Sequence, residues 1–249
     1  MKHTKTKIPR KRILISSLVA IIFSITLACG IYVADYYPAQ TTELSELSFD
    51  ESITKTEISK TVTVYSPEAP TAGFIFYPGG KVEHAAYEPL LMVCAEKGIL
   101  CVLTEMPARL AILDTNAAEG IPELFPQIST WYIGGHSLGG SAAAMYLDEH
   151  WDSFDGLILL GSYSTTDLSS TDLNVLSVYG SEDLVLNMEK YEECKSNLPS
   201  HFRENIIEGG CHSYFGMYGN QNGDGTPTIT VSEQIMQTAD LIADFISMK

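Results

Sequence analysis

The sequence predicts an α/β fold, with helices on both faces of a mostly parallel central sheet, preceded by one N-terminal transmembrane helix. Short apolar runs alternate with helical segments through residues 58–249. The runs 99–104 and 156–160 are apolar at nearly every position, which is typical of strands buried on both faces. Strands that alternate with helices favour parallel pairing through crossover connections. A separate stretch, 13–34, is apolar and carries no charge.

The N-terminal region combines a basic cluster with this uncharged stretch. Residues 1–12 hold six of the 15 basic side chains and no acidic one. At about 1.5 Å per residue, a helix over 13–34 spans roughly the 30 Å hydrocarbon core of a bilayer. The positive-inside rule keeps residues 1–12 in the cytoplasm. We therefore expect a single-pass signal-anchor in the cell membrane, a polar stalk over 35–57 and an extracytoplasmic domain over 58–249.

Two other fates of the N-terminal segment stay open. A signal peptidase could cut after Gly30, where Ala28 lies two positions earlier, but this position falls inside the apolar run. Alternatively, a lipid could be attached to Cys29. Lipoprotein signals usually carry Leu where Thr26 stands, and the apolar run continues past the cysteine. Both observations favour an uncleaved anchor.

The rest of the chain is strongly acidic. It holds nine basic side chains against all 31 acidic ones, a net charge of −22 with histidine neutral. Such a domain repels nucleic-acid phosphates, which argues against a nucleic-acid partner. Cys94, Cys101, Cys194 and Cys211 show no metal-ligand spacing, so we expect no metal and no cofactor. An oxidising compartment would permit disulfides, although Cys94 and Cys101 fall in an apolar helix and strand where buried thiols are common.

Glycine, proline and hydrophobic patterning set the boundaries of the expected elements. Strands are expected at residues 61–65, 73–77, 99–104, 130–133, 156–160, 174–179 and 202–207. Helices are expected at residues 87–97, 138–150, 187–197 and 232–247; the first ends at Gly98, the second is rich in alanine and the last is amphipathic. Segment 107–124 should be helical in pieces, because Gly120 and Pro122 interrupt it. Residues 38–57 are polar and lack periodicity, as a stalk would.

The strongest local motif is Gly135-His136-Ser137-Leu138-Gly139, which matches the G-x-S-x-G nucleophile elbow. In such an elbow, a serine occupies a sharp, strained turn between a strand and a helix, and small neighbours let the turn pack closely. The five-residue pattern alone is not rare. Its context is more specific, because an apolar strand leads into it and an alanine-rich helix leaves it. We therefore interpret Ser137 as a nucleophile rather than an incidental serine in a glycine-rich turn.

A serine nucleophile needs a base, and the base needs an orienting acid. The expected chain order is serine, acid, histidine. His212 follows the last expected strand and is the candidate base. The acid should follow strand 174–179, where Asp183 is favoured and Glu182 is the alternative.

Acyl transfer also needs hydrogen-bond donors for the oxyanion that develops on the substrate. The backbone N–H of Leu138, directly after the nucleophile, is one candidate. The other should come from the loop after strand 73–77, where glycine permits close approach of the backbone to a substrate oxygen. Gly80 is the expected donor in that loop and Lys81 the alternative.

These motifs resemble the alpha/beta-hydrolase superfamily, in particular the small membrane-anchored alpha/beta-hydrolase family-5 domains related to dienelactone hydrolases. The resemblance rests on Tyr77–Glu83, Ile133–Gly140 and Gly209–Gly216, and it extends from about residue 58 to the C-terminus. It implies the alpha/beta-hydrolase fold and a triad of Ser137, Asp183 and His212. Cys211 stands where related sequences often carry a polar residue, which leaves the triad intact.

Two loops bear on what the site could bind. Residues 220–225 partly mimic a calcium loop, but position twelve is Val231 instead of glutamate and no helix precedes the loop, so a polar loop beside the active site is favoured. The connection from Leu160 to Asn174 is too short for a lid insertion, which favours an open, shallow site for small esters or lactones.

Three functional hypotheses follow from these residues. The first is a membrane-anchored serine hydrolase that cleaves a carboxylic ester or lactone through an acyl-enzyme. An acyltransferase would use the same acyl-enzyme with an alcohol or amine in place of water. The third is a non-catalytic, membrane-tethered binding module on a hydrolase scaffold, because one fold can host unrelated functions.

Overall fold

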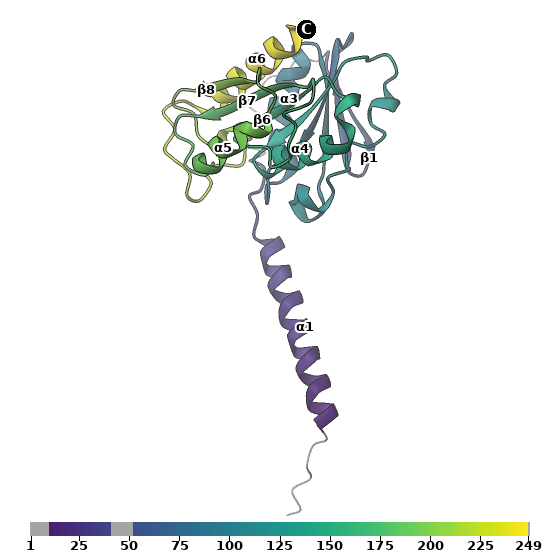
Figure 1. The fold of residues 1–249 in the computed structure, drawn as a ribbon, viewed down its shortest axis with the longest axis vertical. Helices are drawn as coiled ribbons and strands as arrows, with labels where there is room; N and C mark the ends of the chain where they lie inside the picture. The colour runs from purple at the N-terminus through teal and green to yellow at the C-terminus, as the bar shows by residue number, and fades with distance from the viewer. Residues whose placement is uncertain (1–9, 41–51, 249) are drawn as a thin grey trace, which may run out of the picture. The chain divides into compact units, whose positions relative to one another are not determined.

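The computed structural model describes residues 10–40 and 52–248 (Figure 1). The chain divides into two compact units, residues 1–36 and 37–249. In the first unit, helix α1 (Arg10–Ala34) contains an 18-residue window, Ser17–Ala34, with a mean hydropathy of 2.3 and no buried share. Within the described ranges it is the one helix long and apolar enough to cross a membrane. Most of the basic segment 1–12 lies outside the described residues.

The second unit is built on an eight-stranded sheet with strand order β1-β2-β4-β3-β5-β6-β7-β8. Pairing is antiparallel from β1 through β2 to β4 and parallel at every other junction. This is the mostly parallel sheet that the sequence predicts. The strands are β1 (Thr54–Ser59), β2 (Val62–Ser66), β3 (Ala72–Tyr77), β4 (Ile99–Thr104), β5 (Trp131–His136), β6 (Gly156–Leu160), β7 (Asn174–Gly180) and β8 (Arg203–Ile207).

Helices cover both faces of this sheet (Figure 1). Helices α3 (Glu88–Glu96) and α6 (Val231–Ser247) pack together on the face that receives Phe74 and Phe76. Helix α4 (Leu138–His150) covers the opposite face, where Ile75 and Tyr77 point. Successive side chains of β3 therefore pack alternately into the two hydrophobic cores on either side of the sheet. This explains why all six residues of the strand are buried and why each is hydrophobic or glycine.

Shorter elements complete the domain. Helix α5 (Met188–Cys194) follows β7, and its N-cap is Asn187. Single 3-10 turns occur at η1 (His84–Tyr87), η2 (Pro107–Arg109), η3 (Ala111–Leu113), η4 (Pro122–Leu124), η5 (Trp151–Ser153), η6 (Lys195–Asn197) and η7 (Ser213–Phe215). Three of these turns lie in segment 107–124, so the expectation of a helix in pieces is confirmed.

The expected stalk, 35–57, differs from the structure at both ends. Strand β1 begins at Thr54, within that range, and all six of its residues are exposed. It is an edge strand held by backbone pairing with β2, so it shows no hydrophobic alternation that the sequence could reveal. At the other end, Tyr37 N–H donates to Lys81 O (2.8 Å) and Tyr37 O accepts from Glu83 N–H (2.9 Å). Residues 41–51 of the expected stalk lie outside the described residues.

The order of the strands determines where a ligand site can form. From β3 the chain passes to β4 on one side and then returns to β5 on the other side. In open α/β sheets, ligands bind beyond the carboxyl ends of the strands at such a reversal. Here the loop after β3 contains Gly80, and the turn after β5 contains Ser137.

Candidate active site

Ser137 occupies the turn between β5 and α4 in a strained backbone conformation. Its φ of 52° and ψ of −122° lie in a region that non-glycine residues rarely adopt. A Cβ atom at Gly135 or Gly139 would collide with the carbonyl oxygen of Tyr77. The small residues of the motif therefore let the turn pack against β3, as the sequence analysis expected of a nucleophile elbow.

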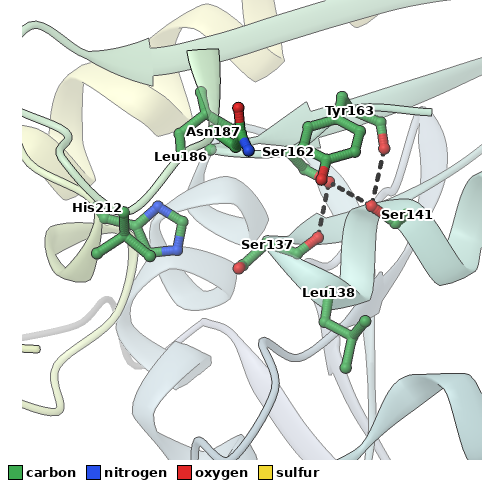
Figure 2. Close-up of a pocket in the computed structure, with 10 residues that line it drawn as sticks. Ser137, Leu138, Ser141, Ser162, Tyr163, Leu186, Asn187 and His212 are labelled. Carbon is green, nitrogen blue, oxygen red and sulfur yellow. Dashed lines mark hydrogen bonds between the residues drawn. The ribbon is translucent and has the colours of Figure 1, made fainter. Parts of the chain in front are cut away.

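Two hydrogen bonds hold this turn from the β6 side. Ser137 N–H donates to the carbonyl of Leu160 at 2.9 Å. The hydroxyl of Ser162 donates to the carbonyl of Ser137 at 2.6 Å (Figure 2). These bonds fix the backbone of Ser137 on both sides of its Cα, so the strain is offset by neighbouring structure.

Asp183 and His212 form a buried hydrogen-bonded pair. Asp183 Oδ2 lies 2.8 Å from His212 Nδ1, and the two side chains are 0% and 1% exposed. The other carboxylate oxygen, Oδ1, accepts the N–H groups of Val185 (3.0 Å) and Leu186 (2.8 Å). Glu182 lies elsewhere in the turn, where its carboxylate accepts from Ser181 Oγ at 3.2 Å. Of the two acids considered from the sequence, Asp183 is the one that contacts the histidine.

The second ring nitrogen of His212 is available on the cavity side. Nε2 is buried and has no hydrogen-bond partner among the described residues. Because Nδ1 faces a carboxylate and donates to it, Nε2 carries the lone pair of the neutral ring. Ser137 and His212 line the same cavity, although no hydrogen bond joins them in this structure (Figure 2).

The cavity has a volume of about 230 Å³. It lies beyond the carboxyl ends of β5, β6 and β7, with a mixed polar and apolar lining of Ser137, Leu138, Ser141, Gly161, Ser162, Tyr163, Val185, Leu186, Asn187 and His212 (Figure 2). This volume fits a small substrate.

The two backbone N–H groups expected to bind an oxyanion belong to segments that lie against each other. A Cβ at Gly80 would meet Leu138 Cδ2 at 3.0 Å, so the two expected donors, Gly80 and Leu138, belong to adjacent segments. Lys81 N–H donates to Arg109 O at 2.8 Å, which removes the alternative donor. Gly80 N–H makes no hydrogen bond within the described part of the chain, and Leu138 is the first residue of α4, whose N–H has no partner inside the helix.

His136 and Tyr87 support the loop that carries Gly80, a role that the sequence analysis did not assign. The Tyr87 hydroxyl accepts from Gly79 N–H (3.1 Å) and lies 2.8 Å from His136 Nδ1. Burial lowers the pKa of His136 well below its ordinary value, and the neighbouring His212 ring, 4.4 Å away between centroids, lowers it further. His136 is therefore neutral, and its Nδ1 accepts the Tyr87 proton.

Two further side chains hold the loop of His212. Asp224 accepts His212 N–H (3.1 Å) and Ser213 N–H (2.8 Å), one on each carboxylate oxygen. Burial opposes its ionisation, but these backbone bonds bring the pKa of Asp224 below its ordinary value. Gln234, on α6, accepts Cys211 N–H (2.9 Å) and donates to Cys211 O (2.8 Å). Asp224 belongs to the segment 220–225 that partly resembles a calcium loop. In the structure, both of its carboxylate oxygens accept backbone N–H groups.

Comparison with known proteins identifies the family. Residues 73–236, more than half of the chain, match the alpha/beta hydrolase family, and the chain belongs to that family. The resemblance drawn from the three motifs is thereby confirmed. No curated protein matches the chain.

Solved structures show the same fold at low sequence identity. A protein described as a CIB-like hydrolase from Thermoplasma acidophilum is 17% identical with a TM-score of 0.54, over 79% of this chain and 100% of its own. A dienelactone hydrolase from Anabaena variabilis is 14% identical with a TM-score of 0.55, over 81% and 99% of the two chains. An alpha/beta hydrolase enzyme from a Mar Chica lagoon metagenome is 15% identical with a TM-score of 0.57, over 78% and 98%.

Proposed function

We propose that this chain is a membrane-anchored serine hydrolase that cleaves a small carboxylic ester or lactone through an acyl-enzyme. The observation that carries the proposal is the buried Asp183–His212 pair. Its His212 belongs to the lining of the same cavity as Ser137, and Nε2 of that ring has no hydrogen-bond partner in the part of the chain that the structure describes. A buried carboxylate that fixes one ring nitrogen makes the other nitrogen a directed base.

The proposed reaction has two halves that use the same groups. His212 Nε2 takes the proton of Ser137 Oγ while the oxygen attacks the carbonyl carbon, and Asp183 stabilises the imidazolium. The N–H groups of Leu138 and Gly80 donate to the oxyanion. His212 then returns the proton to the leaving alkoxide. In the second half, water loses a proton to His212 and attacks the acyl-enzyme, and Ser137 leaves with that proton.

The dimensions of the site support a small substrate. A cavity of about 230 Å³ is below the usual range of roughly 300–1,000 Å³ for drug-sized ligands. The connection between β6 and β7 contains no helix or strand in the described structure. Both features favour a short acyl group over a long buried chain.

Membrane anchoring is part of the proposal. The window Ser17–Ala34 of helix α1 carries no charged residue, and its large side chains are exposed, with Phe23 at 67% and Ile31 at 63%. A helix with this composition is stable in lipid, where its backbone groups bond internally and its side chains meet hydrocarbon. We infer that α1 spans the cell membrane, with the basic N-terminus in the cytoplasm and the hydrolase domain outside.

The test is turnover of short-chain esters and lactones by the full chain in detergent. We expect Ser137→Ala to abolish hydrolysis, whereas Ser169→Ala, an exposed serine outside the cavity, should behave as the wild type. Addition of an alcohol acceptor separates hydrolysis from transfer, since a transferase would form a new ester faster than free acid. Absence of Ser137-dependent turnover over a broad panel, together with tight binding of one compound, would favour the binding-module alternative.

A further inference from the structure

The cavity beside Ser137 has a polar wall whose hydrogen-bond character can be assigned. Ser162 Oγ donates to Ser137 O at 2.6 Å, and Ser141 Oγ donates to Tyr163 O at 2.7 Å. A hydroxyl group has one proton and two acceptor lone pairs. With both protons engaged, the 3.3 Å between the two hydroxyl oxygens is a contact without a shared proton. Ser141 and Ser162 therefore offer only acceptors to a ligand.

Asn187 contributes a donor to the same cavity. Its Oδ1 accepts Lys190 N–H at 3.0 Å and caps helix α5. This bond fixes the orientation of the carboxamide, because a flipped amide would point its NH₂ at another N–H. Nδ2 has no hydrogen-bond partner in the described residues. Figure 2 shows the nitrogen on the Ser137 side of the carboxamide and the oxygen on the far side.

The remaining lining is mostly apolar and includes Leu138, Val185 and Leu186. Asn187 is an exposed residue, so water can bond its Nδ2 in the free protein. An alkyl group bound against Asn187 and the two serines would displace water from these polar atoms without replacing its hydrogen bonds. Buried polar groups left unpaired weaken binding. A hydroxyl group avoids this loss, because its oxygen can accept from Asn187 while its proton is donated to Ser162 or Ser141.

We propose that the natural substrate carries a hydroxyl group on the part that occupies this cavity, and that Asn187 determines this specificity. The inference rests on the proposed ester hydrolysis and adds the chemical class of the substrate: a short hydroxylated ester or lactone. The site would discriminate between the hydroxylated substrate and its alkyl analogue, because the analogue leaves the Asn187 donor and the serine acceptors without hydrogen-bond partners. Sites that form hydrogen bonds to a substrate achieve this kind of selectivity best.

The experiment uses two pairs of esters that differ only by methyl and hydroxyl. Phenyl 3-methylbutanoate and phenyl 3-hydroxybutanoate test the acyl side, and propyl and 2-hydroxyethyl butanoate test the alcohol side. Values of kcat/KM for the full chain are divided by the rate of hydroxide-catalysed hydrolysis, which removes differences in intrinsic reactivity. We expect the hydroxylated ester to be preferred by about tenfold or more in at least one pair.

Variants of Asn187 identify the donor. Asn187→Asp keeps the helix cap but replaces the donor with an acceptor, and Asn187→Ser keeps the cap but removes the amide. In both variants, the ratio of corrected kcat/KM values for the hydroxylated and the alkyl ester should fall close to one. Glu189→Gln, an exposed change in the first turn of α5 and outside the cavity lining, should leave it at the wild-type value.

The outcomes separate this inference from the proposed function. A wild-type ratio near one in both pairs, with Ser137-dependent turnover intact, overturns the inference and upholds the hydrolase. A preference that survives in both Asn187 variants shows that another group recognises the hydroxyl and overturns the role of Asn187. Failure of all four esters to react in a Ser137-dependent way removes the proposed function and this inference with it.

Discussion

Asp183 illustrates how one carboxylate bonds two different sets of partners with its two oxygens. Oδ1 accepts two backbone N–H groups of the following turn, and Oδ2 faces His212. The backbone of the turn therefore fixes the orientation of the Asp183 carboxylate, and the carboxylate fixes the orientation of the His212 ring. In the sequence, the offset from Gly180 favoured Asp183 over Glu182. The direction of the turn in the structure shows which of these adjacent carboxylates contacts His212.

The isosteric change Asp183→Asn tests this division of roles. The asparagine oxygen can keep both backbone bonds, while its NH₂ faces His212 Nδ1 and favours the tautomer with the proton on Nε2. We expect kcat to fall by roughly 10³- to 10⁴-fold with little change in melting temperature. Glu182→Gln is the matched control and should retain activity. Comparable loss in both variants would contradict the assignment.

His136 gives the pH dependence of stability a predictable sign. Its pKa in the folded state is lowered, first by burial and then by His212, so the unfolded chain binds the extra proton first. Stability should therefore fall as pH drops below about 6.5, by up to about 1.4 kcal/mol per pH unit. The lowered pKa of Asp224 acts in a separate window, since its contribution is lost only as pH falls below about 3.8.

Thermal unfolding of the full chain in detergent, between pH 7 and pH 5, measures the His136 effect. We expect His136→Gln to flatten the slope in this range, because the variant lacks the buried His136 imidazole whose protonation burial disfavours. His201→Gln, a change at an exposed position, should keep the wild-type slope. An unchanged slope in His136→Gln would show that another group controls the acid limb.

At the scale of elements, helix α6 holds the loop of His212, the proposed base, although it contributes no group to the cavity lining. Gln234 is fully buried and bonds both backbone groups of Cys211, the residue before His212. The helix is held at its start by a capping box between Thr230 and Glu233. Movement of α6 would therefore move the loop of His212.

Replacement of Gln234 by methionine tests this coupling. The change keeps the approximate volume but leaves Cys211 N–H and C=O buried without partners. We expect a loss of roughly 2–4 kcal/mol in the free energy of unfolding and a lower kcat. Gln237→Met, at an exposed position on the same helix, provides the control. Denaturant unfolding and initial rates on one ester suffice; equal values for the two variants would contradict the role of Gln234.

Local signals and distant contacts differ in what the sequence reveals. The elbow at Ser137 and the bounds of α4, β4 and β6 were predictable, because each depends on a continuous pattern of residues. Asp224 and Gln234 lie 12 and 23 positions from the backbone groups that they bind, and no local pattern marks them. Strand β1 was missed for a related reason: pairing with β2 rather than burial stabilises it.

At the scale of the whole molecule, the chain consists of two compact units. The fold and family are shown for residues of the second unit, whereas α1 is an exposed apolar helix in the first. The second unit begins at Tyr37, which is hydrogen-bonded to the loop that carries Gly80. Truncation between Tyr36 and Tyr37 keeps these hydrogen bonds, so it tests the proposed anchoring and the proposed catalysis separately.

The truncated chain 37–249 is expected to be water-soluble and to keep the kcat/KM of the full chain for a soluble ester. The full chain should remain in the membrane pellet after alkaline carbonate extraction, because an apolar helix in a bilayer is not released by breaking ionic contacts. Release of the full chain by carbonate would exclude a spanning anchor. Lost activity in the truncated chain alone would mean that residues 1–36 support the site.

The most direct measurement is mass-spectrometric mapping of the residue modified by a fluorophosphonate, which reacts with activated serine hydroxyls. We expect stoichiometric phosphonylation of Ser137 in the wild type, none in Ser137→Ala, and a strong reduction in His212→Ala, because the base is required to activate the hydroxyl. Modification at another serine, or unchanged labelling in His212→Ala, would contradict the central claim that Ser137, His212 and Asp183 act as one catalytic unit.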